Sequence, residues 1–560
     1  MKKYSIGLDY GTNSCRALIV DLSDGNEIAS ALFDYLSGES GVLIDHKDPN
    51  LARQNPQDYL DGIASTVTEA ISKARENNPS FDPETVVGIG VDTTGSSPLP
   101  VNEEGVPLSF LPEFTDNLNA MCWLWKDHTS FIEADQITEL AETIRPHYLD
   151  KIGGKYSSEW YWSKVLHCKN IDPQLFDASS SFVELCDYIP AVLTGQTNPN
   201  EIKRSICAAG HKAMYNDEWG GLPDAEFLSE LDPVLCKLRN NYSSVAVSSE
   251  QSAGGLCEEW AQRLGLEPGI AVAVGAFDAH MGAVGAGVKE GTLVKILGTS
   301  TCDIMVQNNN KDLKDIPGVC GIVDGSVMVD HYGIEAGQSA VGDIFLWFVN
   351  NLTPEKYGKT VDQKFVGLEK HAETLKPGES GLLALDWNNG NRTILVDVRL
   401  SGLLVGQTLH TTPHEIFRAF IESTAFGALT IINRIEEYGV KVEEVINCGG
   451  LAVKSPLLMQ IYADVTGRPM KISRSDQTPA LGAAIFGAIA SGAFDNVSSA
   501  QAVMTGIKKT YEPDSESHSV YQQIYSLYSQ AHDAFGTPNW SGQMSNIMKD
   551  LLEIRDGQRG

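Results

Sequence analysis

The chain has 560 residues, of which 42% are hydrophobic and 21% charged, so it is long enough for two or more globular domains with large cores. Its 73 acidic residues outnumber 42 basic ones, and the formal net charge of −31 argues against nonspecific binding to nucleic acid or to an anionic membrane. The sequence has no membrane-spanning apolar run and no signal-peptide pattern, and its ten cysteines are dispersed, so we expect a cytoplasmic protein.

The first part of the chain predicts a three-stranded meander followed by a helix and a buried strand. The predicted strands are 4–9, 15–21, 27–33 and 86–92. The helix starts at Pro56, with Asn55 as its cap, and its apolar residues recur at helical spacing. A meander followed by a helix and a strand is typical of an α/β domain.

A later segment repeats this opening. The sequence Gly11-Thr12-Asn13-Ser14-Cys15 is echoed by Gly298-Thr299-Ser300-Thr301-Cys302, at an offset of 287 residues, and both copies lie between apolar strands. A second helix, predicted over 413–438, leads to a strand over 444–448 and then to Gly449-Gly450. Because two echoes occur in the same order, an internal duplication is favoured over chance. We therefore predict two α/β domains, 1–289 and 290–560.

The two Gly-Thr loops are candidates for holding phosphate, since small residues let backbone N–H groups approach phosphate oxygens and Thr or Ser adds a hydroxyl. Two ordinary hairpin turns are the alternative. Asp9 precedes the first loop, whereas Ile296 takes its place before the second. A lone carboxylate beside a phosphate cleft suits Mg²⁺ held through water, and a turn-stabilising aspartate is the alternative.

Several motifs together resemble the FGGY family of carbohydrate kinases. They cover nearly the whole chain and are Gly7–Thr12, Asp92–Ser96, Leu124–His128, Ala209–Lys212, Phe277–His280, Gly298–Cys302, Gly333–Ser339 and Gly449–Leu451. A later family signature near 402–422 is recognisable apart from Gln407, and an earlier one near 157–167 retains chiefly Lys164. The resemblance implies two actin-like ATPase domains of ribonuclease H-like fold with a cleft between them. ATP would lie mainly on the second domain and sugar mainly on the first.

The resemblance makes Asp278 the candidate catalytic base. A sugar kinase needs a carboxylate to accept or orient the proton of the attacking hydroxyl. Asp278 follows an apolar strand, 270–274, and opens a helix of small residues, 279–287. Its residue context alone leaves a helix-capping aspartate equally open.

Five further residues are candidates for binding a ketopentose, which needs several hydrogen bonds in a partly apolar pocket. They are Ser96, Trp125, Asp127, Lys212 and Glu335. Each alone is more often solvated or paired within the protein. The match with family members that phosphorylate ribulose favours Lys212 and Glu335 most, then Ser96, and leaves Trp125 and Asp127 undecided.

For the nucleotide, the resemblance points to Gly449 and Gly450 as the adenosine-side loop and to Ala480 at the start of an adenine-lining helix. A helix that packs tightly through its small residues is the alternative for Ala480. His128, His211 and His280 lie beside motif residues without metal-ligand spacing in the sequence, so we interpret them as hydrogen-bonding groups.

The resemblance implies ATP-dependent phosphorylation of a ketopentose, L-ribulose at its 5-hydroxyl first, with Mg²⁺ bridging the phosphates. Another sugar or polyol of the family is the first alternative, for example D-ribulose or xylulose. A non-catalytic actin-like sugar sensor is the second. A homodimer is left open, and the last ~50 residues are expected to form helices that pack on the first domain or on another subunit.

Overall fold

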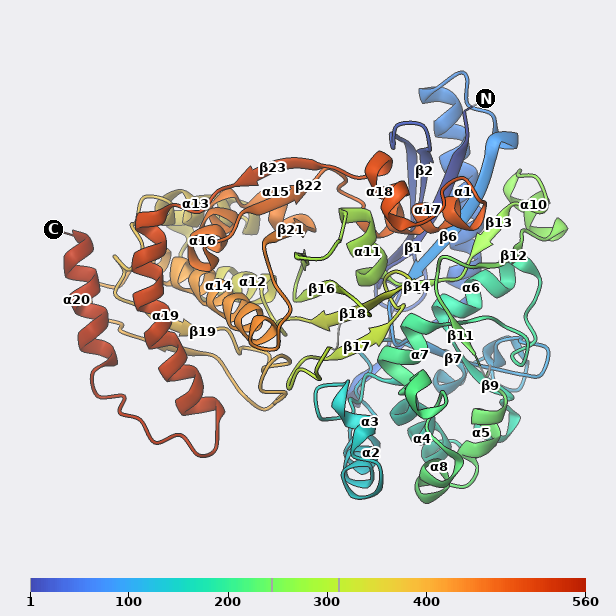
Figure 1. The fold of residues 1–560 in the computed structure, drawn as a ribbon, viewed down its shortest axis with the longest axis horizontal. Helices are drawn as coiled ribbons and strands as arrows, with labels where there is room; N and C mark the ends of the chain where they lie inside the picture. Colours follow the sequence, from blue (N-terminus) through green and yellow to red (C-terminus); the bar gives the residue numbers. More distant parts are fainter. Residues whose placement is uncertain (1, 243–244, 311–312, 560) are drawn as a thin grey trace.

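The computed structural model describes residues 2–242, 245–310 and 313–559, and it contains two large mixed sheets in two lobes (Figure 1). The strands of the first sheet are β1 (Tyr4–Tyr10), β2 (Ser14–Asp21), β3 (Glu27–Asp34), β6 (Val86–Thr93), β12 (Ser252–Gly255), β13 (Ala271–Ala273) and β14 (Ala276–Phe277). Those of the second are β15 (Thr292–Leu297), β16 (Thr301–Asn308), β17 (Gly321–Asp324), β18 (His331–Ala336), β21 (Glu444–Cys448), β22 (Met470–Ser473) and β23 (Ile507–Tyr511). The predicted strands therefore form, with ends shifted by one or two residues.

The two sheets have the same topology, which confirms the predicted duplication. In the first, the antiparallel meander β3-β2-β1 continues into parallel β6 and β13, and in the second β18-β16-β15 continues into parallel β21 and β22. Helix α1 (Pro56–Asn77) and helix α14 (Pro413–Glu437) occupy the same place in the two connections. Asn55 caps α1 by accepting from Gln57 N, as its sequence predicts.

Two helices follow the last parallel strands of the two sheets and pack on each other. They are α11 (Asp278–Ala286) and α17 (Thr478–Ala490). A Cβ on Gly482 of α17 would lie 1.8 Å from the Met281 carbonyl oxygen of α11, so only glycine allows this approach. α17 also contacts β1 and β6 of the first sheet, although it belongs to the second half of the sequence.

A mainly helical segment extends the first lobe between β6 and β12. Its helices include α2 (Phe131–Ile144), α4 (Tyr161–Ile171), α6 (Leu185–Thr194), α7 (Ile206–Ala213), α8 (Ala225–Leu231) and α9 (Leu235–Asn240). Apart from α6, whose apolar residues join the core of the first sheet, they enclose a core rich in aromatic side chains. Trp123, Tyr161 and Trp162 belong to this core and are all fully buried. Helix α7 of this segment also contacts β17 of the second sheet.

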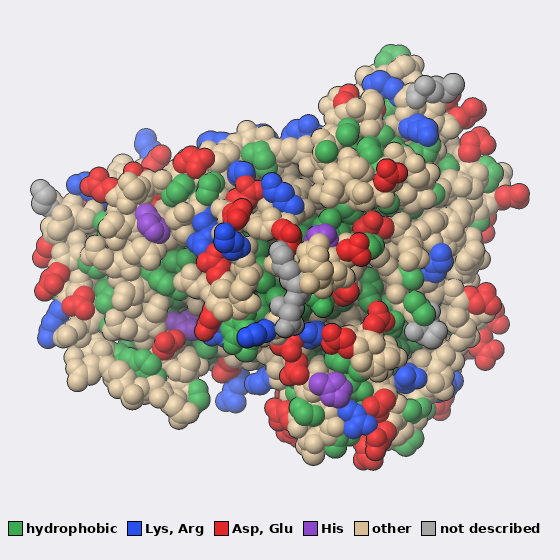
Figure 2. Space-filling model, in the orientation of Figure 1, with side chains coloured by type: hydrophobic (Ala, Val, Ile, Leu, Met, Phe, Trp, Pro, Cys, Tyr) green, Lys and Arg blue, Asp and Glu red, His purple; other side chains and the backbone are tan. Residues whose placement is uncertain are grey.

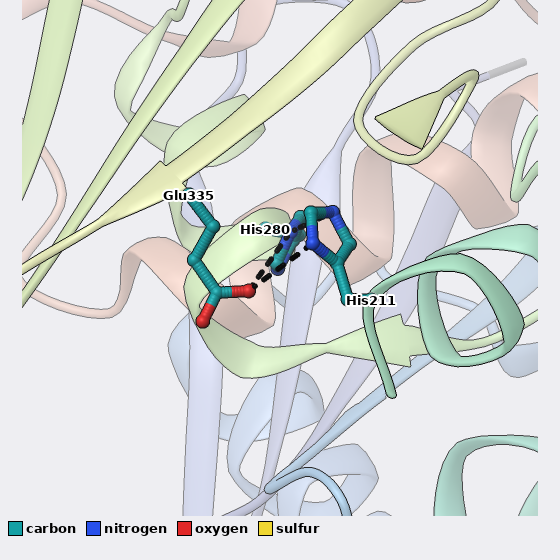
Figure 3. A group of neighbouring side chains, drawn as sticks. All are labelled: His211, His280 and Glu335. Carbon is teal, nitrogen blue, oxygen red and sulfur yellow. Dashed lines mark hydrogen bonds and ion pairs between the residues drawn. The ribbon is translucent and has the colours of Figure 1, made fainter. Parts of the chain in front are cut away.

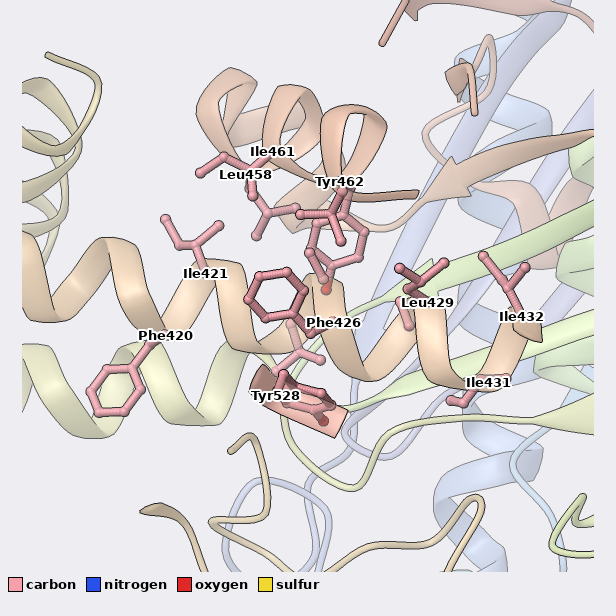
Figure 4. Close-up of a cluster of buried hydrophobic side chains, with 14 of the residues drawn as sticks. Phe420, Ile421, Phe426, Leu429, Ile431, Ile432, Leu458, Ile461, Tyr462 and Tyr528 are labelled. Atoms are coloured by element: carbon pink, nitrogen blue, oxygen red, sulfur yellow. The ribbon is translucent and has the colours of Figure 1, made fainter. Parts of the chain in front are cut away.

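The second lobe is built around α14, whose apolar side chains meet α16 (Pro456–Thr466) and Tyr528 (Figure 4). Tyr528 belongs to α19 (Ser515–Gly536), and α20 (Ile547–Arg559) follows it. We expected the last ~50 residues to pack on the first domain or on another subunit. The structure does not place them on the first domain, and contact with another subunit stays a prediction. Both helices lie on the second lobe, at the end of the molecule away from the first sheet (Figure 1). Instead α17 and α18 (Val497–Met504) return to the first sheet.

The cysteine thiols, the hydropathy of the helices and the surface charge agree with the composition. Each of the ten cysteines, all within the described ranges, has a free thiol. Within those same ranges no helix has the length and hydropathy to cross a membrane. Acidic side chains are spread over the face shown in Figure 2, with basic ones between them, as the net charge of −31 requires.

Candidate active site

Three carboxylates gather at the carboxyl ends of neighbouring strands in the first sheet. Asp9 on β1 is the register partner of Asp92 on parallel β6, so both side chains lie on one face of the sheet. β14 runs parallel to β6, with Ala276 beside Asp92, and Asp278 begins α11 directly after it. Sheet topology thus brings together residues from three separate parts of the chain.

The carboxylates strongly perturb one another. Burial and then the charge of Asp9 raise the pKa of Asp278 to about 7, although the Ala279 N–H donates to its Oδ1 at 2.6 Å. Burial also raises the pKa of Asp9, despite the Arg16 guanidinium at 3.3 Å. Burial, Asp9 and Asp278 together hold the pKa of Asp92 well above its ordinary range. Such a cluster is poised to exchange protons or to hold a cation.

Asp92 is the member that we did not predict as a site residue. It is fully buried, and apart from the neighbouring carboxyl of Asp9 neither of its oxygens has a hydrogen-bonding partner among the described residues. The sequence does carry a signal for it. Two glycine-containing apolar strands, 4–9 and 86–92, both end in aspartate, and pairing them in parallel places the aspartates together.

Asp278 lies at the start of α11, but it does not cap the helix. Phe277 occupies the cap position, and among the described residues the carboxylate of Asp278 accepts only from Ala279, the next residue. The capping alternative that the sequence left open is therefore not what forms here. The side chain stays partly exposed and can reach a ligand.

Lys212 and Glu335 form an ion pair beside this cluster. Lys212, on α7, places its Nζ 3.1 and 3.2 Å from the two carboxylate oxygens of Glu335, on β18. Burial opposes the charge on Lys212, but Glu335 offsets it and raises the pKa of the lysine. The rings of Trp160 and Phe277 lie 5.4 and 5.7 Å from the ammonium. Polar groups bounded by aromatic rings are what a sugar site requires.

Two buried histidines, His211 and His280, lie beside the Glu335 carboxylate (Figure 3). His211 Nδ1 is 3.4 Å and His280 Nε2 is 3.9 Å from Glu335 Oε2, and the two Nε2 atoms are 3.0 Å apart. Burial and His280 lower the pKa of His211 far below its ordinary value, and burial lowers the pKa of His280 to about 4. The sequence suggested hydrogen-bonding histidines but gave no sign that they would meet at Glu335.

The first Gly-Thr loop turns between β1 and β2 with its residues exposed or half-buried. The Gly11 N–H donates to the Ser14 carbonyl at 3.0 Å, and Asn13 Nδ2 donates to the Ser40 carbonyl at 2.7 Å. Trp125 Nε1 donates to Thr12 Oγ1 at 3.0 Å. Trp125 therefore supports this loop, in addition to any contact that it makes with a ligand.

The second Gly-Thr loop lies beside Gly449. A Cβ on Gly449 would be 2.4 Å from the Leu297 carbonyl oxygen, and the residue has φ of +91°. The carbonyl of Thr299 accepts from Val341 N at 2.8 Å. Gly449 and Gly450 line a pocket of about 180 Å³. Its other lining residues are Asn447, Cys448, Val453, Lys454, Ile472, Ser473, Ser475 and Asp476.

Three predicted site residues are engaged inside the protein. Ala480 is fully buried, and its carbonyl oxygen would be 1.8 Å from a Cβ on Gly7, so the packing alternative for this helix is the one observed. Asp127 is fully buried, with its oxygens taken by Ala52 N, Arg53, and the N–H and hydroxyl of Thr129. The Ser96 hydroxyl, also buried, donates to Glu184. In this geometry none of the three offers a ligand an open polar group.

A buried lysine that the sequence marked only by resemblance supports this region. Lys164 Nζ donates to the carbonyls of Ser96 and Leu124, both at 2.8 Å, and so ties two loops together. Burial lowers the pKa of Lys164 to about 7, against the attraction of Glu184. Its full burial assigns it to structure and not to ligand contact.

Comparisons with known proteins agree with this architecture over nearly the whole chain. Residues 4–285 match the N-terminal domain of the FGGY family of carbohydrate kinases, and residues 293–491 match its C-terminal domain. A ribulokinase from Vibrio parahaemolyticus is 44% identical over 94% of this chain and 95% of that protein. A ribulokinase from Shouchella clausii is 40% identical over 100% of this chain and 99% of that protein.

Solved structures share the fold at much lower sequence identity. A xylulose kinase from Rhodospirillum rubrum has a TM-score of 0.76 at 20% identity, covering 95% of this chain and 99% of that one. A Plasmodium falciparum glycerol kinase with ADP has a TM-score of 0.74 at 14% identity, covering 96% of this chain and 99% of that one. Together with the duplicated sheets, these matches confirm the fold expected from the sequence.

Proposed function

The chain belongs to the FGGY family of carbohydrate kinases, and from that premise we propose that it transfers the terminal phosphoryl group of ATP to the 5-hydroxyl of L-ribulose. The observation that carries the choice of sugar is the full-length identity of 40–44% to proteins named ribulokinase. A non-catalytic sensor is disfavoured because Asp9 and Asp278 are both present and adjacent.

Asp278 is assigned as the general base. A base works best when its pKa lies near the working pH, and that of Asp278 is about 7. It would accept the proton of the 5-hydroxyl as the oxygen attacks the γ-phosphorus, and the bond from the γ-phosphorus to the bridging oxygen of ADP breaks. Lys212 would donate to, and Glu335 accept from, hydroxyls of the sugar.

The Gly-Thr loops and the glycine pair are assigned to the nucleotide. Gly11–Ser14 and Gly298–Ser300 would direct amides and hydroxyls at the phosphates, as strand-turn loops of small residues can. The pocket beside Gly449 and Gly450 would take the adenosine end. Ala480 drops out of this assignment because it is sealed in helix packing.

Mg²⁺ would be held near Asp9 and Asp92. The fit rests on the donor set: carboxylate oxygens suit this ion, and those of Asp92 have no other partner among the described residues than Asp9. When bound, the metal would neutralise phosphate charge. The sequence pointed to Asp9 alone, and the proposal adds Asp92 because its carboxylate lies beside Asp9.

A coupled assay of ADP release tests the proposal, with L-ribulose, D-ribulose, L-xylulose, D-xylulose and glycerol compared at saturating Mg·ATP. We expect the highest kcat/KM for L-ribulose, and a phosphorus NMR spectrum of the product should show a primary phosphate ester. A higher kcat/KM for xylulose or glycerol would overturn the choice of sugar while leaving the family assignment intact.

A further inference from the structure

The imidazoles of His211 and His280 connect three elements that the proposed reaction needs. His211 precedes Lys212 on α7, His280 follows Asp278 by two residues on α11, and both face Glu335 on β18. Glu335 thus contacts α7 through His211 and Lys212 and α11 through His280, and both helices carry proposed site residues (Figure 3).

A metal ion is the first possibility for two imidazoles and a carboxylate, since their ligand atoms lie within 4.8 Å of one another. The Lys212 ammonium argues against it. It lies 3.1 and 3.2 Å from the two oxygens of Glu335 and already compensates their charge. A divalent cation on the same carboxylate would be repelled by the lysine, so a hydrogen-bonded arrangement is favoured.

The placement of protons in this arrangement follows from the contacts. Glu335 is ionised beside Lys212 and can only accept, so a lone pair on His211 Nδ1 facing it at 3.4 Å would be repelled. We therefore assign the proton of His211 to Nδ1 and the acceptor role to Nε2, which places the Nε2 lone pair near a Ser326 hydroxyl that also donates to the Val323 carbonyl at 3.1 Å. His280 Nε2, 3.0 Å from His211 Nε2, then carries the other proton. The resulting arrangement runs from His280 through a hydrogen bond to His211, and His211 Nδ1 then lies 3.4 Å from the Glu335 carboxylate, with both rings neutral.

The backbone around the rings leaves little room for other arrangements. Gly321 on β17 is the register partner of Glu335, and a Cβ at Gly321 would lie 2.2 Å from His211 Nδ1. A Cβ at Gly210 would lie 2.3 Å from Cγ1 of Val323. His211 Nε2 also lies 3.1 Å from the Ser326 hydroxyl. Gly210 and Gly321 thus allow α7 to pack closely on β17 and β18, so that His211 contacts Glu335.

From this geometry we infer that His211 and His280 are positioning residues, which hold the Glu335 carboxylate in the orientation that receives the sugar. The inference rests on the proposed function, because it takes Glu335 as a sugar ligand. Loss of the His280 N–H would leave His211 free to change tautomer and turn a lone pair toward Glu335. The carboxylate would then move away, and sugar binding would weaken while the nucleotide site stayed as it is.

A pair of variants at His280 tests this. His280→Gln keeps an N–H donor near the position of Nε2, and His280→Leu removes it at similar volume. We expect the KM for L-ribulose to rise about 10-fold in the Leu variant and to stay near the wild-type value in the Gln variant. The KM for ATP should stay within about 2-fold of wild type in both variants. His532→Leu, which removes another buried imidazole, should lower the melting temperature without changing either KM. Equal KM values for Leu and Gln, or a loss confined to melting temperature, would overturn the inference.

A second measurement uses the unmodified protein, in case His280→Leu does not fold. Nitrogen-15 NMR of histidine side chains should show His211 protonated at Nδ1 and His280 at Nε2 near neutral pH. His211 protonated at Nε2, or one zinc ion per chain found by elemental analysis of the purified enzyme, would overturn the inference. If wild-type protein binds no L-ribulose but phosphorylates another sugar, the proposed substrate fails and the histidine test is repeated with that sugar.

Discussion

The carboxyl ends of the two sheets are related by duplication and differ in chemistry. In the first, Asp9 on β1 pairs in register with Asp92 on β6, and in the second Ile296 on β15 pairs with Cys448 on β21. The helix after the last parallel strand begins at Asp278 in one copy and at Thr478 in the other. Three acidic residues in the first copy therefore correspond to three neutral residues in the second.

The two Gly-Thr hairpins also differ by one residue in register. Tyr10 pairs with Cys15 across the first turn, whereas Leu297 pairs with Thr301 across the second. The five-residue echo in the sequence therefore does not correspond residue by residue in space. Because side chains alternate between faces, a one-residue slip changes which of them face the cleft.

This difference teaches how a duplicated fold can divide a reaction. The acidic end offers a base and a place for a cation, which suit the acceptor hydroxyl and the metal. The neutral end, with Gly449 beside its hairpin, offers close backbone approach without negative charge, which suits a nucleotide. Four predictions follow from the comparison.

Asp278→Asn should have the largest effect, because it removes the only proposed proton acceptor at the acidic end. We expect kcat to fall about 10²- to 10⁴-fold while sugar affinity, measured by calorimetry, stays within a few fold. Thr478→Val, at the counterpart position, serves as the control and should retain most of kcat. A kcat near wild type for Asp278→Asn would remove the assigned role.

Asp92→Asn should weaken the hold on the metal of the nucleotide complex. Without the Asp92 charge beside Asp9, we expect Mn²⁺ affinity in the presence of ATP to fall about 10- to 100-fold by electron paramagnetic resonance. Cys448→Ser, at the counterpart position, should leave Mn²⁺ affinity unchanged. If both variants bind Mn²⁺ as wild type does, Asp92 has no part in the metal site.

Ile296→Asp makes the neutral end resemble the acidic one. A carboxylate beside the second hairpin would repel the phosphates, and we expect the KM for ATP to rise about 10-fold. Ile296→Asn, similar in shape but uncharged, separates charge from altered packing. An equal rise in the two variants would show that packing, and not charge, governs this position.

The pH dependence should be about as large as the effect at Ile296. The pKa of Asp278 is raised to about 7, so its base form is lost as pH falls through that value. Between about pH 6 and about pH 8 we expect kcat to rise about tenfold and then level off, from the fraction of ionised carboxylate. A flat kcat profile measured over that range would contradict the assignment of Asp278 as the titrating base.

Local patterns in the sequence predicted the elements well. The meander, the cap of α1, the extent of α14, and the positions of Asp9 and Asp278 next to the ends of apolar strands were legible, because side-chain periodicity and turn residues act over a few positions. The repeated Gly-Thr turn also revealed the duplication. Asp92 was within reach of the same reasoning, but only if the parallel pairing of 4–9 with 86–92 had been used.

Three other site predictions stay predictions, and burial weighs against them in this geometry. Ser96 and Asp127 have residue types suited to a sugar, yet both are fully buried and bonded to neighbours in the fold. Ala480 has the small side chain expected beside an adenine, yet the same smallness allows α17 to press on β1. A small or polar residue serves packing and binding equally well, so its type alone does not distinguish them.

The sequence by itself determined the elements around the two Gly-Thr turns, the repeat, the family resemblance and the positions of Asp9 and Asp278 beside apolar strands, since these depend on neighbours along the chain. Only the tertiary structure decided that Glu335 meets Lys212, His211 and His280, that α17 crosses to the first sheet, and that α19 and α20 stay on the second lobe. Those contacts join residues far apart in sequence, and they form because whole helices and sheets bury their apolar faces together.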